Sequence, residues 1–325
     1  MGVEKTVFLL VLIYVVVTDR SPSLIKRMSD PTSSTSPVSE ERELLSNEGG
    51  GPQHVQFLTG VNDNYDGVTV HLEDPMDAED FALKLQASIQ RWRQEGKKGI
   101  WIKMPIGLAN LVETAVQEGF RYHHAEPDYL MLVAWISDLP DTIPSNASHR
   151  VGIGAFVLNP DGKVLVVQET GGPFRGTNVW KLPTGVVNQG EHIIDAAVRE
   201  VREETGIDTD FVEILAFRQS HGSFHGKSDL FFLCVLKAHS YEIKKQESEI
   251  LAAKWMPVEE YVNQPFVQRH EMFRYMANIC VKKMENDYTG FSPVPTTTSS
   301  GRRIYMYCNS SHADELVSRQ GGSSL

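Results

Sequence analysis

Three glutamates lie close together near the middle of the chain, at the spacing of one helix face. Glu200 precedes Glu203 by three positions and Glu204 by four, so on a helix the three side chains share a surface. Each like-charge pair there costs about 0.2–0.5 kcal/mol, and the negative end of the helix dipole adds a comparable penalty. Converging carboxylate oxygens are ligands for a hard cation such as Mg²⁺ or Mn²⁺. We therefore predict a metal site whose cation offsets the cost of the cluster.

The residues around the cluster predict the helix that carries it. Gly206 is placed to end that helix in a left-handed cap, and Gly185 and Gly190 flank the loop that comes before it. One apolar face recurs at helical spacing through Ile194, Ala197, Val198 and Val201. The segment is therefore expected to form a loop, a helix and a second loop, with the carboxylates on the hydrated face. A solvated acidic face is the alternative for an E-x-x-E-E pattern taken alone.

The longer pattern around the glutamates is more specific. Gly185, Glu191 and the run REVREETGI (199–207) resemble the Nudix box at every defined position. For about residues 150–284 this resemblance implies a Nudix fold, in which a mixed sheet lies between helices and the box helix covers one face. It also implies hydrolysis of a nucleoside diphosphate linked to another group, X.

The resemblance implies a role for each matching residue. Glu200 and Glu204 would be direct metal ligands, and Glu203 a further ligand or the base that activates water. A Mg²⁺ or Mn²⁺ ion would be the cofactor. Gly185, Glu191, Arg199 and Gly206 would be structural: the glycines would shape the loops, and Arg199 would orient the carboxylates by pairing with Glu191.

Residues outside the box look like those of the plant-type ADP-ribose/NADH pyrophosphatase group. The matching stretches are GVTVHL, IWIKMP and EGF in the first half and WKLPTGVV, FRQSH and KSDLFF in the second. This resemblance implies that ADP-ribose and NADH are hydrolysed to AMP and the other phosphorylated half. The alternatives are another substrate of the same class (a coenzyme A, a nucleotide sugar or a dinucleoside polyphosphate) or a nucleotide-sensing module without turnover.

Other side chains are weaker candidates for the same site. Glu249 precedes a predicted strand, in a region from which several Nudix enzymes recruit an extra ligand or base, and Glu247 competes for that role. In the glycine-rich loop, Phe174 is a candidate for stacking on a base, and Arg175 and Lys181 for contacting phosphates. His221 and His225 are four residues apart, but in a predicted loop that spacing does not indicate a metal pair.

Composition and periodicity predict an α+β chain with two folded domains. The expected divisions are an apolar segment and disordered linker (1–54), a pre-Nudix domain (55–140), the Nudix domain (148–284) and a mostly loose tail (285–325). Within the tail, RRIYMYC (302–308) is a candidate for an edge strand. The Nudix domain is expected to be an α/β/α sandwich with a mixed sheet. The first domain is expected to form a smaller β-α-β-α-β unit that resembles half of an acetyltransferase. It lacks the pyrophosphate loop of those enzymes, so we expect a non-catalytic dimerisation or lid module, and with it a possible homodimer.

The predicted elements follow hydrophobic periodicity and turn signals. In the first domain, strands are expected at 67–72, 99–105 and 129–136, a helix after an N-cap at Asp77, and a second helix ending at Gly119. In the second domain, strands are expected within 151–169 and at 179–183, 211–219, 229–238 and 252–257, before a helical run at 258–284 that Pro265 interrupts.

Charge and cysteine content exclude several function classes. A net charge of −11 leaves no basic field for nucleic acid or an anionic membrane. The partner that the resemblance implies is a small nucleotide. Three cysteines without a C-x-x-C pair argue against a disulfide framework and a thiolate zinc site, and fit a reducing compartment, the cytoplasm. The eleven apolar residues 7–17 are too short to span a bilayer. Residues 1–27 are either an incidental extension or an organelle-targeting or membrane-anchoring segment, and membrane contact is expected only in the second case.

Overall fold

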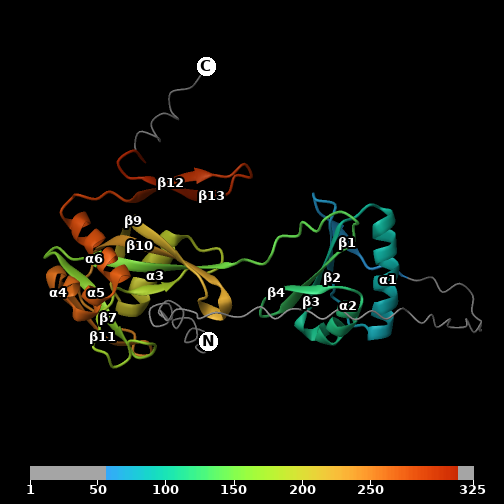
Figure 1. The fold of residues 1–325 in the computed structure, drawn as a ribbon, viewed down its shortest axis with the longest axis horizontal. Helices are drawn as coiled ribbons and strands as arrows, with labels where there is room; N and C mark the ends of the chain where they lie inside the picture. The colour runs from blue at the N-terminus through green and yellow to red at the C-terminus, as the bar shows by residue number, and fades with distance from the viewer. Residues whose placement is uncertain (1–55, 314–325) are drawn as a thin grey trace, which may run out of the picture. The chain divides into compact units, whose positions relative to one another are not determined.

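The computed structural model describes residues 56–313, and the predictions for residues 1–55 and 314–325 lie outside the described residues. Between residues 56 and 313, no helix is both long and apolar enough to cross a membrane. The described chain divides into two compact units at the junction of Ala147 and Ser148. Each unit has its own sheet and core (Figure 1), and each is described by itself.

The first unit is a five-stranded sheet with helices packed on its apolar side. Its strands are β1 (Gly60–Asn62), β2 (Val68–His71), β3 (Gly99–Pro105), β4 (Arg121–Ala125) and β5 (Tyr129–Trp135). They lie in the order β1-β2-β3-β5-β4, with β2 and β3 parallel. Because parallel strands cannot be joined by a tight hairpin, they need a long crossover, and the 17-residue helix α1 (Ala78–Gln94) provides it.

Helix α1 begins at the residue that the sequence indicates. The Asp77 carboxylate accepts hydrogen bonds from the backbone amides of Glu79 and Asp80, both at 2.9 Å. Of the apolar residues predicted for its buried face, Leu83 is exposed, and the others pack in the core: Phe81, Leu85, Ile89 and Trp92. The predicted second helix is divided into a 3₁₀ segment, η3 (Ile106–Leu111), and α2 (Val112–Gln117).

The prediction of three strands in this unit was incomplete, because β1 and β4 were not expected. Strand β1 has three residues, all exposed, and therefore carries no buried pattern. Strand β4 has the polar sequence RYHHA and a register shift between Tyr122 and His124 where it pairs with β5. Neither strand shows the alternation of apolar residues from which a strand is predicted.

The second unit contains an eight-stranded mixed sheet. Its strands are β6 (His149–Leu158), β7 (Lys163–Glu169), β8 (Thr184–Val186), β9 (Thr209–Ser220), β10 (Ser228–Ala238), β11 (Ile250–Pro257), β12 (Phe291–Thr297) and β13 (Arg303–Asn309). The order is β11-β7-β6-β10-β9-β12-β13, and β8 pairs with β6. The pair β6 and β10 is parallel, and the other pairs are antiparallel.

Helices cover both faces of this sheet, which confirms the predicted α/β/α sandwich (Figure 1). Alternation along β6 divides its apolar run: Ile153 and Ala155 pack with the box helix α3 (Ile193–Thr205), whereas Phe156 packs on the opposite side. That opposite side is covered by three helices: α4 (Val258–Val262), α5 (Pro265–Arg269) and α6 (Glu271–Met284). Pro265 begins α5, where its missing amide donor leaves no helical hydrogen bond unmade.

The strand predicted at 179–183 is a single bridge in the structure. The backbone N–H of Lys181 donates to Val167 at 3.0 Å and its carbonyl accepts from Val167 at 2.8 Å. Pro183, two residues later, has no amide to extend the ladder. The strand that does form here, β8, begins at the next residue, Thr184.

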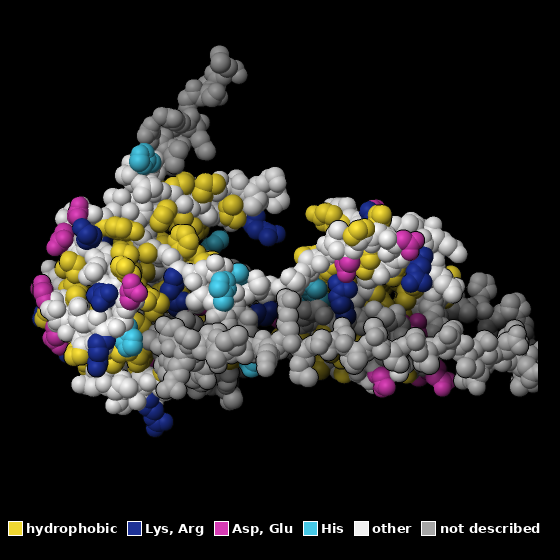
Figure 2. All heavy atoms as spheres, viewed as in Figure 1, with side chains coloured by type: hydrophobic (Ala, Val, Ile, Leu, Met, Phe, Trp, Pro, Cys, Tyr) yellow, Lys and Arg dark blue, Asp and Glu magenta, His cyan; other side chains and the backbone are white. Residues whose placement is uncertain are grey.

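The expectation of a loose tail from residue 285 was wrong for its described part, because β12 and β13 form a hairpin that joins the sheet at β9 (Figure 1). The candidate edge strand at 302–308 is confirmed by β13, which lies at the end of the sheet order. Glu213 anchors the hairpin. Although it is only 2% exposed, its carboxylate accepts from the Gly290 amide at 3.0 Å and pairs with Ser310 and Lys283. These three partners satisfy a carboxylate that would otherwise be buried alone. Hydrophobic side chains remain on the outside of the hairpin (Figure 2).

Candidate active site

Helix α3 places the three glutamates at different depths. It ends as predicted at Gly206, whose φ of 71° is left-handed and whose amide donates to the Arg202 carbonyl at 2.9 Å. The Glu203 side chain is 36% exposed and that of Glu200 14% exposed, whereas Glu204 is almost fully buried. The acidic face is therefore not a uniformly solvated surface.

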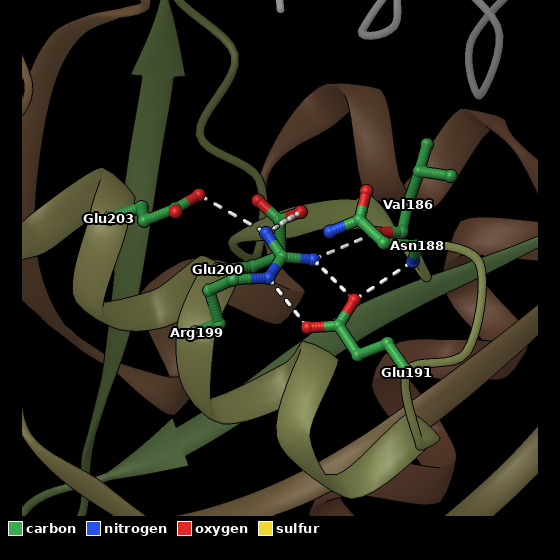
Figure 3. A network of polar contacts seen from close by, with 6 residues as sticks. All are labelled: Val186, Asn188, Glu191, Arg199, Glu200 and Glu203. Atoms are coloured by element: carbon green, nitrogen blue, oxygen red, sulfur yellow. Dashed lines mark hydrogen bonds and ion pairs between the residues drawn. The ribbon is translucent and has the colours of Figure 1, made fainter.

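Arg199 lies at the centre of the carboxylates (Figure 3). Its guanidinium donates two hydrogen bonds to Glu191, at 2.7 and 2.9 Å, which is the pairing that the sequence predicts. The same group donates to Glu200 at 2.7 Å and to Glu203 at 3.1 Å. A fifth hydrogen bond, at 3.0 Å, reaches the Val186 carbonyl at the end of β8. Arg199 thus connects the box helix to the loop before it.

This network changes the account of how the charge cluster is tolerated. The sequence predicts that a metal cation offsets the repulsion, but Arg199 already neutralises part of it. Its hydrogen bonds lower the pKa of Glu191, and these bonds in turn raise the pKa of Arg199 above its usual range. A fixed cation between three carboxylates holds them in one arrangement, so their positions are set before any ligand arrives.

Glu204 is outside this network. It is 2% exposed, and neither of its carboxylate oxygens has a hydrogen-bond partner. Burial raises the pKa of Glu204 well above its usual range, and Lys181 opposes that shift. A buried carboxylate without a partner is unfavourable by itself, and it is the group in this cluster that a cation would stabilise most.

The loop before the helix approaches Glu200 closely. A Cβ atom at Gly185 would overlap the carboxyl group of Glu200, so only glycine leaves room for that side chain. The loop is closed by the Asn188 amide, which donates to Glu191 at 2.8 Å. Gly185 and Glu191 therefore act on the site from opposite ends of one loop.

The donor set fits a hard divalent cation. Glu200, Glu203 and Glu204 supply carboxylate oxygens from a single helix, and those of Glu204 are unpaired. Among residues 56–313, no three His, Cys, Asp or Glu side chains already converge at ligand positions, and Arg199 holds two of these glutamates. Coordination by all three would therefore use carboxylate oxygens that Arg199 does not hold, or exchange an Arg199 contact for the metal.

Glu249 lies at the same end of the domain as Glu204. The segment that precedes β11 contacts the end of the box helix: the Gln246 amide donates to the Glu204 carbonyl at 3.0 Å. Three residues later, the Glu249 carbonyl accepts from the Thr170 amide at 2.8 Å. Glu247, its competitor for the role, is exposed and paired with Lys245.

The three substrate-contact candidates have different surroundings. Phe174 packs edge-on against Phe266 of α5, with ring centroids 4.8 Å apart, and lines a recess. Arg175 is exposed in the loop. Lys181 is not an exposed cation: it is 7% exposed and forms an ion pair with the buried Glu169.

An apolar recess lies between β10 and the helices on the face of the sheet opposite α3. Its lining includes Phe174, Trp180 and Phe231, together with Lys181 and Thr184, the residue before Gly185. An adjoining hollow of about 350 Å³ shares Phe231 with it. Aromatic walls are typical of small-molecule sites.

Two buried ion pairs near this recess were missed by sequence reasoning. Arg218 pairs with Asp229 at 3.1 Å and lies over the ring of Phe231, 5.0 Å from its centroid. Glu169 and Lys181 form the second pair. Each charged residue sits in a predicted strand, and only the tertiary fold shows that its neighbour is buried beside it.

The two histidines of the β9–β10 loop form no metal pair with each other. The Nδ1 of His221 lies 2.9 Å from the Ser228 hydroxyl, whereas His225 packs edge-on against Phe224. Their residues belong to the turn around the 3₁₀ segment η4 (Phe224–Gly226).

Comparisons with known proteins cover both units. A family model described as "Nudix hydrolase domain" matches residues 58–136, and one described as "NUDIX domain" matches residues 148–278. Nudix hydrolase 7 of Arabidopsis thaliana is 63% identical over 274 residues, which are 83% of this chain and 97% of the relative. Nudix hydrolase 6 of the same plant is 60% identical, over 83% of this chain and 96% of the relative. Nudix hydrolase 2 is 56% identical, over 82% and 92%.

Proposed function

The chain belongs to the Nudix hydrolase family, and on that premise we propose that it is a metal-dependent pyrophosphatase of nucleoside diphosphate derivatives. The proposed substrates are ADP-ribose and NADH, each hydrolysed to AMP and the other phosphorylated half. The observation that carries the proposal is the buried, unpartnered carboxylate of Glu204 beside the glutamates that Arg199 orients.

Glu200 and Glu204 are the proposed ligands of Mg²⁺ or Mn²⁺, with Glu203 as a further ligand or base. When bound, the cation neutralises charge on the phosphates and lowers the pKa of an attacking water. Arg199 keeps Glu200 and Glu203 in place through its hydrogen bonds to both. Glu203, the most exposed of the three, or Glu249 accepts the proton from water.

The recess supplies the proposed binding site for the nucleoside. Phe174 and Trp180 offer aromatic surfaces for a base. Gln264 holds Trp180 in place: its amide donates to the Trp180 carbonyl at 3.0 Å, and its oxygen accepts from the Trp180 N–H at 2.9 Å. Because Thr184, the residue before Gly185, also lines the recess, we place the diphosphate of a bound nucleotide on the side of the glutamates.

A substrate panel tests this function. The full chain would be assayed with ADP-ribose, NADH, coenzyme A, a nucleotide sugar and a dinucleoside polyphosphate, with Mg²⁺, with Mn²⁺ and with a chelator. We expect the highest kcat/KM for ADP-ribose and NADH, with AMP as a product, and loss of turnover with chelator. Faster turnover of another panel member would reassign the X group. Tight nucleotide binding without turnover of any member would instead indicate a sensor.

A further inference from the structure

Lys181, Glu169 and Glu204 form a buried cluster that contains one cation and two carboxylates. Glu169 is 3% exposed, Lys181 7% and Glu204 2%. Lys181 pairs with Glu169, and the oxygens of Glu204 have no partner. Lys181 is therefore paired with Glu169, which lies outside the Nudix box, and not with Glu204.

The backbone holds this pair beside the metal-ligand helix. The bridge between Lys181 and Val167 fixes Lys181 against β7, where Glu169 lies two residues beyond Val167 and on the same side of the strand. Glu169 is itself fixed by its pairing with Ile250 of β11. The ion pair is thus built on rigid strands.

Thr184 connects Lys181 to Glu204. The Lys181 ammonium donates to the Thr184 hydroxyl at 2.7 Å. The backbone amide of the same threonine lies close enough to Glu204 to lower the pKa of its carboxyl group, although it forms no hydrogen bond with it. Thr184 therefore contacts the Lys181 ammonium and also influences the Glu204 carboxyl group, and the ammonium is carried on a flexible four-carbon chain.

We propose that Glu169 is a positioning residue that holds the Lys181 ammonium away from Glu204 and so keeps Glu204 open for the metal. The inference rests on the proposed function, because it concerns the ligand that a cation would occupy. A lysine released from Glu169 would turn to the only unpartnered carboxylate of the cluster. It would then compete with the metal for the same oxygens.

The proposal predicts a rescue that a merely structural role would not give. Glu169→Gln removes the restraint, so Mn²⁺ affinity should fall at least about tenfold, as for other residues that orient a metal ligand. Adding Lys181→Met removes the competitor, so the double variant should recover to within about threefold of the unsubstituted protein. Lys181→Met alone should bind Mn²⁺ no more weakly than the unsubstituted protein.

The measurement is the dissociation constant of Mn²⁺ for the full chain, by electron paramagnetic resonance, with thermal unfolding as a check of the fold. Unchanged affinity in Glu169→Gln, or a double variant as weak as the single one, would overturn the proposal. If Glu169→Gln alone does not fold, the other two variants decide, and a tenfold loss in either would overturn it. Failure of the unsubstituted protein to bind Mn²⁺ would instead refute the proposed function.

Discussion

Replacing Glu204 with glutamine is expected to lower kcat at least about 100-fold, because a direct metal ligand should matter at least as much as the residues that orient one. The fold should remain intact. Glutamine has nearly the same shape and removes a buried charge whose oxygens have no hydrogen-bond partner. The free energy of unfolding of the metal-free protein should therefore stay the same or rise. Steady-state kinetics and thermal unfolding with and without Mg²⁺ measure both effects.

The matched control is Glu285→Gln, which removes the same charge from an exposed position at the end of α6. It should leave both kcat and the free energy of unfolding nearly unchanged. Added Mg²⁺ should raise the unfolding temperature of the unsubstituted protein and of this control, but much less that of Glu204→Gln. Full turnover in Glu204→Gln would remove Glu204 from the set of ligands.

Replacing Gly185 with alanine is expected to reduce activity through displacement of Glu200. The added methyl group would occupy the position of the Glu200 carboxyl group, which must then move. Displacement of a catalytic group by about 1 Å can cost about 100-fold in rate, so we expect a loss of about 10- to 100-fold in kcat. Since a side chain rather than the backbone yields, the unfolding temperature should change little.

The control for this variant is Gly107→Ala, where an added methyl group meets no atom within 4 Å. Gly107 is exposed in the first unit, and its substitution should leave kcat unchanged. Comparing Mn²⁺ affinities separates the causes of any loss. Weaker Mn²⁺ binding in Gly185→Ala, and not in Gly107→Ala, is expected if Glu200 is a ligand. Normal kinetics in Gly185→Ala would show that the position of Glu200 does not matter.

Local patterns predicted the parts of the site that lie within one segment. The helix face and the left-handed cap at Gly206 follow from spacing within one helix, whereas the pairing of Arg199 with Glu191 was implied by the resemblance to the Nudix box. The sandwich was implied by the resemblance to the Nudix box, whereas apolar runs and turn signals predicted its central strands.

Features that depend on distant residues were not predictable in this way. The hairpin of β12 and β13 contains two prolines and was expected to be loose, but Glu213, 77 residues before Gly290, holds it. Glu169, Lys181 and Glu204 come from three segments of the fold. Nothing in the local sequence indicates that Lys181 is buried with a partner, so the sequence made it only a weak candidate for contacting phosphates.

The central claim is that water attacks a phosphorus atom of the diphosphate, and the position of an ¹⁸O label tests it most directly. The full chain would hydrolyse ADP-ribose and NADH in ¹⁸O-labelled water with Mg²⁺, and the products would be analysed by mass spectrometry. A metal site beside a diphosphate stabilises charge on both phosphates, so the P–O–P bridge is the bond expected to break. We expect AMP with ribose 5-phosphate or reduced nicotinamide mononucleotide, the label in a phosphate of one product, and unchanged absorbance of the reduced ring. Free nicotinamide, or label on a ribose carbon, would contradict the account.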